Sequence, residues 1–297
     1  FLGSGKTTLL NHILEDPNHG LRFAIVENEF GDVGVDERIL SEKADEEVIE
    51  VMNGCICCTV RGDLVVALKN LYNKISQFDA VIIETTGLAD PAPVAQTFFV
   101  DDDIQSKFTL DGIITVTDSK HILARLDDEK PEGVENEAVE QVAFADRLLL
   151  NKCDLASGEE ELQRVEARLR AINAFAPIQR CEQAEVDVSS VLGIRGFSLE
   201  RTLEMEPGFL DTEGAEHQHD ESVSSMSIVQ PGEVDGEVLQ DWLHTLLQTQ
   251  GASIFRMKGV LSVAGSDRKL VYQAVHMILQ WTAQERWPEG EARVSRL

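Results

Sequence analysis

The segment "FLGSGKTTLLNHIL", residues Phe1 to Leu14, decides the fold class of this chain. It carries most of the motif G-x-x-x-x-G-K-[ST], in which glycines let backbone N–H groups converge on phosphate oxygens. The first glycine of that motif would lie just before Phe1, so the sequence begins inside the motif and we expect one strand to precede it. The rest of the motif is intact and consists of Gly3, Ser4, Gly5, Lys6, Thr7 and Thr8.

The motif predicts a site for a nucleotide with Mg²⁺. A lysine ammonium in this position reaches the β and γ phosphates, and the hydroxyl that follows it ligates Mg²⁺. Four apolar residues behind the loop share one helical face and predict a helix whose N-terminus meets the anion. They are Leu9, Leu10, Ile13 and Leu14. A glycine-serine turn that contains a lysine by chance is the alternative, and this helix disfavours it.

Short apolar runs that end in polar residues alternate with helical stretches along the first two thirds of the chain. The runs are "FAIVENEF" (23–30), "EVIEVMNG" (47–54), "AVIIETTG" (80–87), "GIITVTD" (112–118) and "RLLLNKCD" (147–154), and the clearest helical stretches are Leu64 to Ser76 and Glu159 to Ile172. This rhythm predicts an α/β fold with a doubly wound, mostly parallel sheet. Ligands of such sheets gather at the carboxyl ends of the strands.

The texture changes at residues 204–222, "EMEPGFLDTEGAEHQHDES", which are acidic and show little periodicity. We therefore expect a nucleotide-binding domain at 1–203, a His-containing linker at 204–222 and a smaller α+β domain at 223–297. The small domain should hold a strand at 224–229, a helix at 237–249 and a hairpin that turns at 265–267. Its tryptophans, Trp242, Trp281 and Trp287, fit packing better than a cofactor site.

Composition excludes several classes of function. The formal charge of −27 argues against binding of a nucleic-acid backbone, which needs a basic surface. No run approaches the length that spans a membrane, and a hydrophobic fraction of 43% can form a core. Five cysteines, three of them clustered, favour a reducing compartment over a disulfide framework. We expect a cytoplasmic protein, with a targeting peptide left open because the sequence begins inside a motif.

Two strand ends carry further chemistry. "AVIIETTG" places Glu84 where an acid can serve Mg²⁺ or a water molecule, and Gly87 where a backbone N–H can meet the γ-phosphate. "NKCD" follows an apolar strand, and the carboxylate of Asp154 can accept from the N1–H and the amine of guanine. Asn151 and Lys152 would support the base and the loop. The order of these motifs predicts guanine specificity.

"NGCICCTV", residues 53–60, concentrates the thiols of Cys55, Cys57 and Cys58. Cysteine is often a small buried hydrophobe, but packing explains such a cluster poorly in a chain with few cysteines. Thiolates suit Zn²⁺, Cu(I) or another thiophilic metal, and three ligands leave a fourth position open for transfer. Redox use of the neighbouring Cys57 and Cys58 is the alternative, although C-x-x-C is the commoner redox spacing.

Taken together, "GSGKTTLLNHIL", "ENEFGDVGVD", "NGCICC", "ETTGLADP" and "NKCD" resemble the CobW-type metal-handling P-loop GTPases, above all the YjiA-like and zinc-regulated GTPase metalloprotein activator groups. The resemblance covers nearly the whole chain. It implies a GTPase that binds Zn²⁺, or a related ion such as Co²⁺, and delivers it to a client metalloprotein. It also implies homodimerisation in some members, client recognition by a CobW-type tail domain, and one more strand after Leu297.

Carried onto this sequence, the resemblance implies that Lys6 holds phosphate, Thr7 holds Mg²⁺, and the "NKCD" residues read guanine. It implies that the three clustered cysteines hold the metal. Nearby residues that could complete the metal site are Glu27, Asp32 and His121. The alternative for each carboxylate, Glu29 included, is a solvated loop acid, and for His121 a satisfied polar contact. His217 and His219 share a face of an extended segment and could form an auxiliary metal hook, although a polar linker is the simpler interpretation.

Two rival functions use part of these motifs. A zinc buffer without catalysis would need the thiols but not a guanine reader. A P-loop kinase for a small molecule would use the phosphate loop and Glu84 but would leave "GCICC" and "NKCD" without a role.

Overall fold

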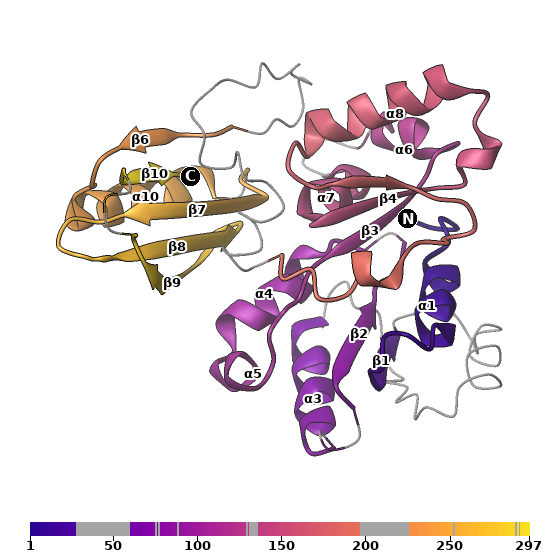
Figure 1. Cartoon of the computed structure of the whole chain (residues 1–297), viewed down its shortest axis with the longest axis horizontal. Coiled ribbons are helices and arrows are strands. Elements are labelled where there is room, and N and C mark those ends of the chain that lie inside the picture. The colour runs from indigo at the N-terminus through magenta and orange to yellow at the C-terminus, as the bar shows by residue number, and fades with distance from the viewer. Residues whose placement is uncertain are drawn as a thin grey trace. The chain divides into compact units, whose positions relative to one another are not determined.

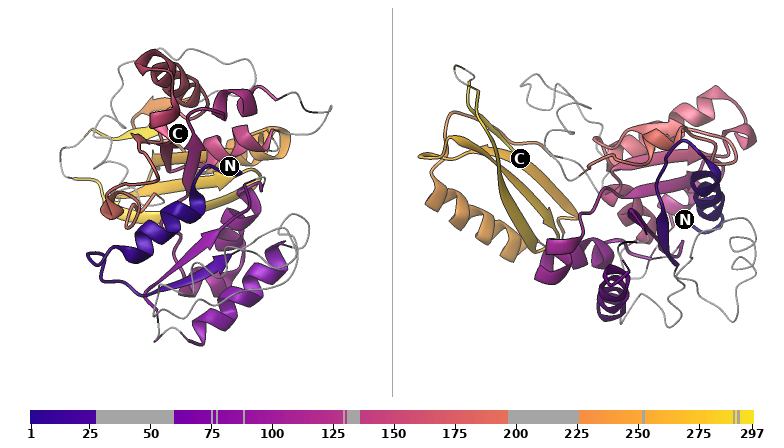
Figure 2. Two further views of the ribbon diagram at one scale, coloured as in Figure 1. Left: turned by 90° about the vertical axis from the view of Figure 1, so that its right-hand side faces the viewer. Right: turned by 60° about the horizontal axis from the view of Figure 1, so that its bottom comes forward.

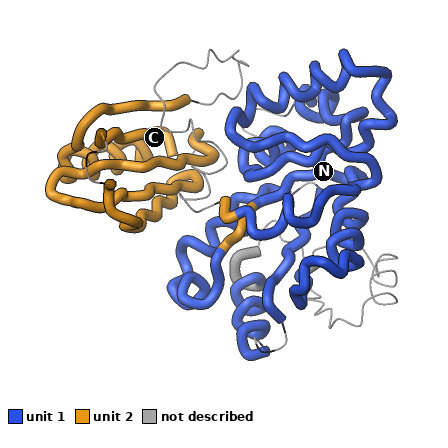
Figure 3. The backbone as a smooth tube through the Cα atoms, viewed as in Figure 1, with its two compact units in different colours: residues 1–109, 113–194 blue, residues 110–112, 195–297 orange. Residues whose placement is uncertain are grey.

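The computed structural model describes most of the chain outside two long stretches. The described residues are 1–27, 60–74, 76, 78–87, 89–128, 130, 136–196, 226–251, 253–288, 290 and 292–297. The chain divides into two compact units, the first made of residues 1–109 and 113–194 and the second of residues 110–112 and 195–297 (Figure 3). The linker predicted at 204–222 lies outside the described residues.

The first unit contains parallel strands, as the sequence predicts (Figure 1). Two of them pair with each other, β1 (Phe23–Glu27) and β2 (Ala80–Glu84). Three others form a second sheet in the order β3 (Ile114–Asp118), β4 (Arg147–Asn151) and β5 (Ile178–Arg180). The strand predicted at 47–54 lies outside the described residues. The short strand β5 has no apolar run of its own and was not predicted.

Helices connect these strands. They are α1 (Lys6–Glu15), α3 (Val60–Tyr72), α4 (Ala92–Val100), α5 (Asp102–Lys107), α6 (Ile122–Leu126), α7 (Glu137–Phe144) and α8 (Glu159–Ile172), with short 3-10 turns η1 (Cys153–Leu155) and η2 (Val188–Ser190). The helix predicted at 159–172 is confirmed with the same bounds. The helix predicted at 64–76 begins earlier, at Val60, and ends at Tyr72. Among the described residues, no helix is long and apolar enough to cross a membrane.

The helix behind the phosphate loop packs against both groups of strands. Leu9 and Ile13 of α1 share one apolar core with Phe23 of β1, Val116 of β3 and Leu149 of β4. The backbones of α1 and of these strands can be followed in the two views of Figure 2. Each of these side chains is less than a tenth exposed, so their burial contributes roughly 1.5–3 kcal/mol apiece. Because α1 is anchored on both sides, its first turn is held in a fixed place at the carboxyl ends of the strands.

In its described residues, the second unit contains an antiparallel sheet and the long helix α10 (Gly236–Gln250). Its strands follow the order β6 (Val229–Pro231), β10 (Val294–Arg296), β7 (Arg256–Ser262), β8 (Arg268–Val275) and β9 (Ile278–Arg286). The predicted hairpin is confirmed, since β7 and β8 pair across a turn where Gly265 takes the left-handed φ of 81°. The predicted strand at 224–229 is misplaced, because β6 begins where that prediction ends.

The tryptophans of this unit lie in different environments. Trp287 is buried and lies 5.1 Å from the ammonium of Lys269, whereas Trp281 is exposed and stacks on Tyr272. Trp242 is 41% exposed on α10. Packing, as the sequence suggests, accounts for the buried ring and the stacked ring.

Candidate functional site

The phosphate loop depends on two glycines in left-handed backbone conformation, Gly3 with φ 68° and Gly5 with φ 106°. Gly5 comes directly before α1 and has a second requirement. A Cβ atom at this position would lie 2.5 Å from the side-chain nitrogen of Asn151. The backbone angle and the close approach of Asn151 therefore both select glycine here.

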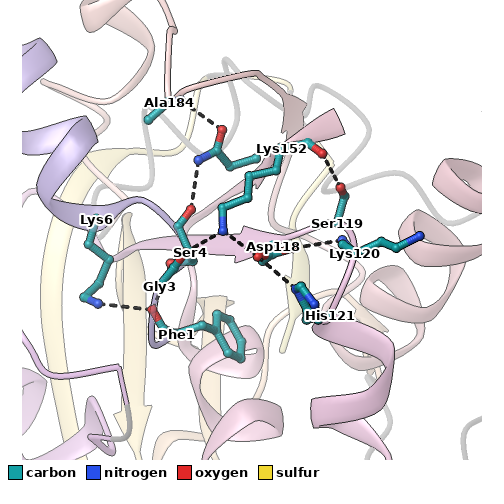
Figure 4. A network of polar contacts seen from close by, with 11 residues as sticks. Phe1, Gly3, Ser4, Lys6, Asp118, Ser119, Lys120, His121, Lys152 and Ala184 are labelled. Carbon is teal, nitrogen blue, oxygen red and sulfur yellow. Dashed lines mark hydrogen bonds and ion pairs between the residues drawn. The ribbon is translucent and has the colours of Figure 1, made fainter. Parts of the chain in front are cut away.

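Polar side chains of the loop converge on one backbone carbonyl. The buried Ser4 hydroxyl donates to Phe1 O at 2.9 Å, and the Lys6 ammonium donates to the same oxygen at 3.1 Å (Figure 4). The Lys6 ammonium also lies 3.8 Å from the carboxylate of Glu84, which ends β2. The loop thus keeps a positive charge beside an acid at the sheet edge.

Asn151 connects the phosphate loop to the segment that follows β5. Its amide nitrogen donates to Ser4 O at 2.8 Å, and its side-chain oxygen accepts from the backbone N–H of Ala184 at 2.9 Å. The residue is buried, so both polar atoms need such partners. Asn151 therefore braces the phosphate loop against the segment that follows β5.

Lys152 makes a second connection to the same loop. Its backbone takes the left-handed conformation with φ 61°, and its ammonium donates to Gly3 O and to the Asp118 carboxylate, each at 2.7 Å. The hydroxyl of Ser119 donates to the carbonyl of Lys152 at 2.7 Å (Figure 4). The ends of β3 and β4 are therefore joined to the phosphate loop through one lysine.

Asp118 is the acid at the centre of this network. It accepts from Lys152, from the backbone N–H of Lys120 at 2.9 Å and from His121, whose Nδ1 lies 3.2 Å away. Burial raises the pKa of the Asp118 carboxyl, but these hydrogen bonds outweigh it and leave the pKa below its ordinary value. Asp118 stays ionised at neutral pH and fixes the Lys152 ammonium.

The loop after β2 lies against the phosphate loop. A Cβ atom on Gly87 would come within 2.1 Å of the backbone nitrogen of Leu2, so the two backbones are in direct contact there. Glu84 and Gly87, predicted from "AVIIETTG", are both brought to the phosphate loop. In the parallel register of β1 and β2, Glu27 pairs with Glu84, so β1 delivers the chain to the same edge.

Gln141 of α7 is a site residue that sequence reasoning missed. Its buried side-chain amide donates to the backbone carbonyls of Gly87 and Ala89 and accepts from the terminal amino group of Phe1. Gln141 lies in a helix between two recognised motifs. The helical periodicity of the sequence does not distinguish it from a glutamine on the surface. Only tertiary contacts reveal it.

Asp154 lies in η1, two residues after Lys152, and is exposed. The left-handed turn at Lys152 carries the chain from the buried Asn151 to this exposed carboxylate. An incoming base could meet the carboxylate here without displacing the core of the unit.

Most of the predicted metal ligands lie outside the described residues. These are Cys55, Cys57, Cys58, Asp32, the side chain of Glu27, and the histidines His217 and His219. His121 is described, and its ring contacts Asp118 with most of its surface exposed. Within the described part of the chain, no group of three or more His, Cys, Asp or Glu side chains could hold a metal ion.

Family models match most of the chain. The nucleotide-binding domain of CobW/HypB/UreG matches residues 1–180, and the C-terminal domain of the cobalamin synthesis protein CobW matches residues 223–297. The chain is 35% identical over 292 residues to the zinc chaperone YjiA of Escherichia coli, with 97% of this chain and 87% of that protein covered.

Two further comparisons agree with these matches. The chain is 42% identical over 212 residues to zinc-regulated GTPase metalloprotein activator 1 of Schizosaccharomyces pombe, which covers 69% of this chain and half of that protein. The crystal structure of Zn(II)-bound YjiA GTPase from E. coli superposes with a TM-score of 0.71 at 29% identity, covering the whole of this chain and 90% of that one.

Proposed function

Because this chain belongs to the CobW/HypB/UreG family and is a P-loop GTPase of the CobW type, we propose that it is a metallochaperone controlled by its nucleotide. It binds zinc through Cys55, Cys57 and Cys58 while GTP is bound, and it gives the metal to a client apoprotein after hydrolysis. Zinc is the cargo in this proposal and GTP is the substrate.

One observation carries the proposal: β1 ends at the edge of the parallel strands where the phosphate loop and its partners gather, and the chain continues from there into the segment that contains the cysteines. Glu84 ends β2 at 3.8 Å from Lys6, and Asn151 and Lys152 tie the phosphate loop to β3 and β4. Glu27 pairs with Glu84, so the chain enters the segment that contains the cysteines at this edge. Ligands of parallel sheets bind there because the connecting loops gather at the carboxyl ends.

The other end of the cysteine segment is also anchored. Cys58 comes two residues before α3 begins at Val60. The helix ends at Tyr72 and the chain then enters β2 at the opposite edge, beside the ion pair of Arg22 with Asp79. A helix of this length rises about 20 Å, so a right-handed connection returns its first turn to the nucleotide edge. This supports a metal site close enough to respond to the nucleotide.

The side chains suit GTP and Mg²⁺. The Lys6 ammonium, which donates to Phe1 O of the phosphate loop, would meet the phosphates, and the exposed Asp154 would accept hydrogen bonds from guanine. Thr7, in the first turn of α1, and Glu84 supply a hydroxyl and a carboxylate, the oxygen donors that Mg²⁺ prefers. When bound, Mg²⁺ neutralises part of the negative charge of the phosphates. Glu84 would orient the attacking water, and Gly87 would offer its N–H to the γ-phosphate.

The remaining parts of the chain complete the proposal. The GTPase domain would occupy 1–203 and the CobW-type domain 223–297, with the acidic stretch 204–222 between them as a linker. The tail domain would recognise the client, and a homodimer would be compatible with this role. A cytoplasmic setting would keep the thiols reduced. Cobalt in place of zinc would use the same thiolates, and His121, Glu27 or Asp32 would offer a fourth ligand.

The proposed function is tested with full-length protein purified anaerobically. We expect zinc to copurify or to bind on addition, and GTP turnover to change when zinc is present. The assay compares zinc content and phosphate release with and without the metal. Zinc binding with no hydrolysis would instead support a buffer, and transfer of labelled phosphate from GTP to a metabolite would support a kinase.

Asp154→Asn should change the preferred base. The amide can donate to the C2 carbonyl of xanthine but cannot accept from both guanine donors. A mismatched hydrogen bond costs about 1–3 kcal/mol, so GTP affinity should fall roughly 5- to 150-fold while XTP affinity rises. Competition among GTP, ATP and XTP measures this. Asp102→Asn, which removes an exposed carboxylate in α5, is the matched control. An unchanged GTP preference in Asp154→Asn would show that "NKCD" does not read the base.

A further inference from the structure

Gln141 bonds to both loops that would surround the γ-phosphate. Its amide nitrogen donates to Gly87 O at 3.2 Å and to Ala89 O at 2.9 Å, and its side-chain oxygen accepts from the terminal amino group of Phe1 at 3.1 Å. The residue is only 7% exposed. A buried amide that uses both of its ends is a fixed support, because every lost bond would leave a buried polar group unpaired.

These bonds determine how the peptide at Gly87 is oriented. The carbonyl of Thr86 accepts from the backbone N–H of Ala89 at 3.1 Å, which fixes the peptide that joins Thr86 to Gly87. In a trans peptide the N–H points opposite to the carbonyl, so the Gly87 N–H is directed away from that turn. Gln141 then fixes the next carbonyl, that of Gly87 itself. The N–H of Gly87 therefore lies between two carbonyl groups whose directions are fixed, those of Thr86 and Gly87.

The same side chain fixes the phosphate loop. Gln141 holds the nitrogen of Phe1, while the carbonyl of Phe1 accepts from Ser4 and Lys6. The backbone of Gly87 also lies directly against that of Leu2, where no side chain would fit between them. Gln141 therefore joins the loop that carries Lys6 to the loop that carries the Gly87 N–H.

Gln141 is in turn held from β3. The hydroxyl of Thr115 donates to the backbone carbonyl of Gln141 at 2.7 Å, and Thr115 is buried. The helix α7 begins at an Asn136 cap whose side chain accepts from the backbone N–H of Ala138. The support for the two loops thus rests on a sheet strand and a capped helix.

We infer that Gln141 is a positioning residue for GTP hydrolysis, which sets the Gly87 N–H against the γ-phosphate in register with Lys6. This inference rests on the proposed function, which places GTP in the phosphate loop. Gln141 acts through backbone groups and does not touch the nucleotide. Since GDP lacks the γ-phosphate, loss of Gln141 should weaken binding of GTP far more than binding of GDP.

The test replaces Gln141 with leucine, which has a similar volume and no hydrogen-bonding group. We expect kcat to fall about 10- to 100-fold, the size of effect that a misplaced catalytic group produces. We also expect the affinity for a non-hydrolysable GTP analogue, divided by the affinity for GDP, to fall by a factor of at least the same size. Steady-state kinetics, calorimetric titration with each nucleotide and urea unfolding provide the data.

Asn173→Leu is the matched control. Asn173 is a buried amide that donates to three carbonyls, those of Val142, Ala143 and Ala145, at the other end of α7. Its loss should lower stability in the same way but leave the ratio of GTP analogue to GDP affinity unchanged. An equal fall of that ratio in both variants would overturn the inference, because general loosening would then explain it.

A second pair of variants, with smaller changes, tests the inference if Gln141→Leu folds poorly. Thr115→Val removes the hydroxyl that holds Gln141, and Thr117→Val removes its neighbour on β3, which donates to Leu149 O at 3.0 Å instead. We expect only Thr115→Val to lower the ratio. If the wild-type chain hydrolyses GTP, and both Gln141→Leu and Thr115→Val keep its kcat and its ratio of GTP-analogue to GDP affinity, this inference alone is overturned. Absence of turnover in the wild-type chain would overturn the proposed function with it.

Discussion

Lys6→Ala should abolish GTP hydrolysis and leave the fold intact. The Lys6 ammonium is held at the phosphate loop by Phe1 O and faces Glu84 at 3.8 Å, so it is in place before the nucleotide arrives. A preorganised charge of this kind stabilises the charge that develops on the γ-phosphate during transfer. Removal of one such donor costs about 10²- to 10³-fold in kcat.

Stability should change little in Lys6→Ala. The side chain is about a quarter exposed, and a partly solvated ion pair at this distance contributes no more than about 1 kcal/mol. Metal binding without nucleotide should also persist, because the cysteines are not altered. Phosphate release, urea unfolding and zinc titration of the same preparation separate these effects.

Lys120→Ala is the matched control for Lys6→Ala. Lys120 is exposed near the same network, and only its backbone N–H serves Asp118 (Figure 4). The variant removes an equal charge without touching the phosphate loop, so it should hydrolyse GTP at the wild-type rate. Near-wild-type turnover in Lys6→Ala would reject the assignment of the phosphate loop. Equal losses in both variants would indicate a general effect of charge.

The sequence predicts the elements that repeat a strong local pattern. Leu148, Leu149 and Leu150 form a run without a polar break, and the strand β4 they build is fully buried at these positions. The helix α8 is equally clear because its apolar residues recur with helical spacing and three glutamates open its first turn. In such segments the residue propensities, the hydrophobic periodicity and the signals at the ends all predict the same element.

The sequence predicts less where a contact joins distant segments. The three-residue strand β5 exists because it pairs with β4, not because of its own composition. Gln141 reaches Gly87 across 54 positions of chain, and Asn151 reaches Ser4 across 147. The motif "NKCD" marks Asn151 as important, yet its role as a brace of the phosphate loop becomes visible only in three dimensions.

Zinc should bind more tightly when the protein also holds Mg²⁺ and a non-hydrolysable GTP analogue than when it holds GDP. The cysteine segment follows β1, whose last residue pairs with Glu84, and it precedes α3, whose first turn we infer to lie at the same edge. A loop that closes over the γ-phosphate can bring Glu27 or Asp32 to the three thiolates, and hydrolysis releases it again. Coupling of this kind is typically 1–3 kcal/mol, or roughly 5- to 150-fold in affinity.

Serine at positions 55, 57 and 58 should remove both zinc binding and its dependence on nucleotide. Cys153→Ser is the control for loss of a thiol elsewhere. Burial raises the pKa of the Cys153 thiol, so at neutral pH it stays protonated and is a poor ligand. This variant should retain the full difference between the GTP analogue and GDP. Chelator competition under reducing conditions gives the zinc affinity in each nucleotide state.

Linkage makes the coupling testable from the other side. Whatever factor the GTP analogue adds to zinc affinity, zinc must add to the affinity for the analogue. Zinc-loaded wild-type protein should therefore bind the analogue more tightly than zinc-free protein, and the variant without the three cysteines should show no such difference. Equal zinc affinity in both nucleotide states would contradict delivery driven by hydrolysis. The thiols would then be a passive store, because a metal that binds both states equally cannot be released by passing from one to the other.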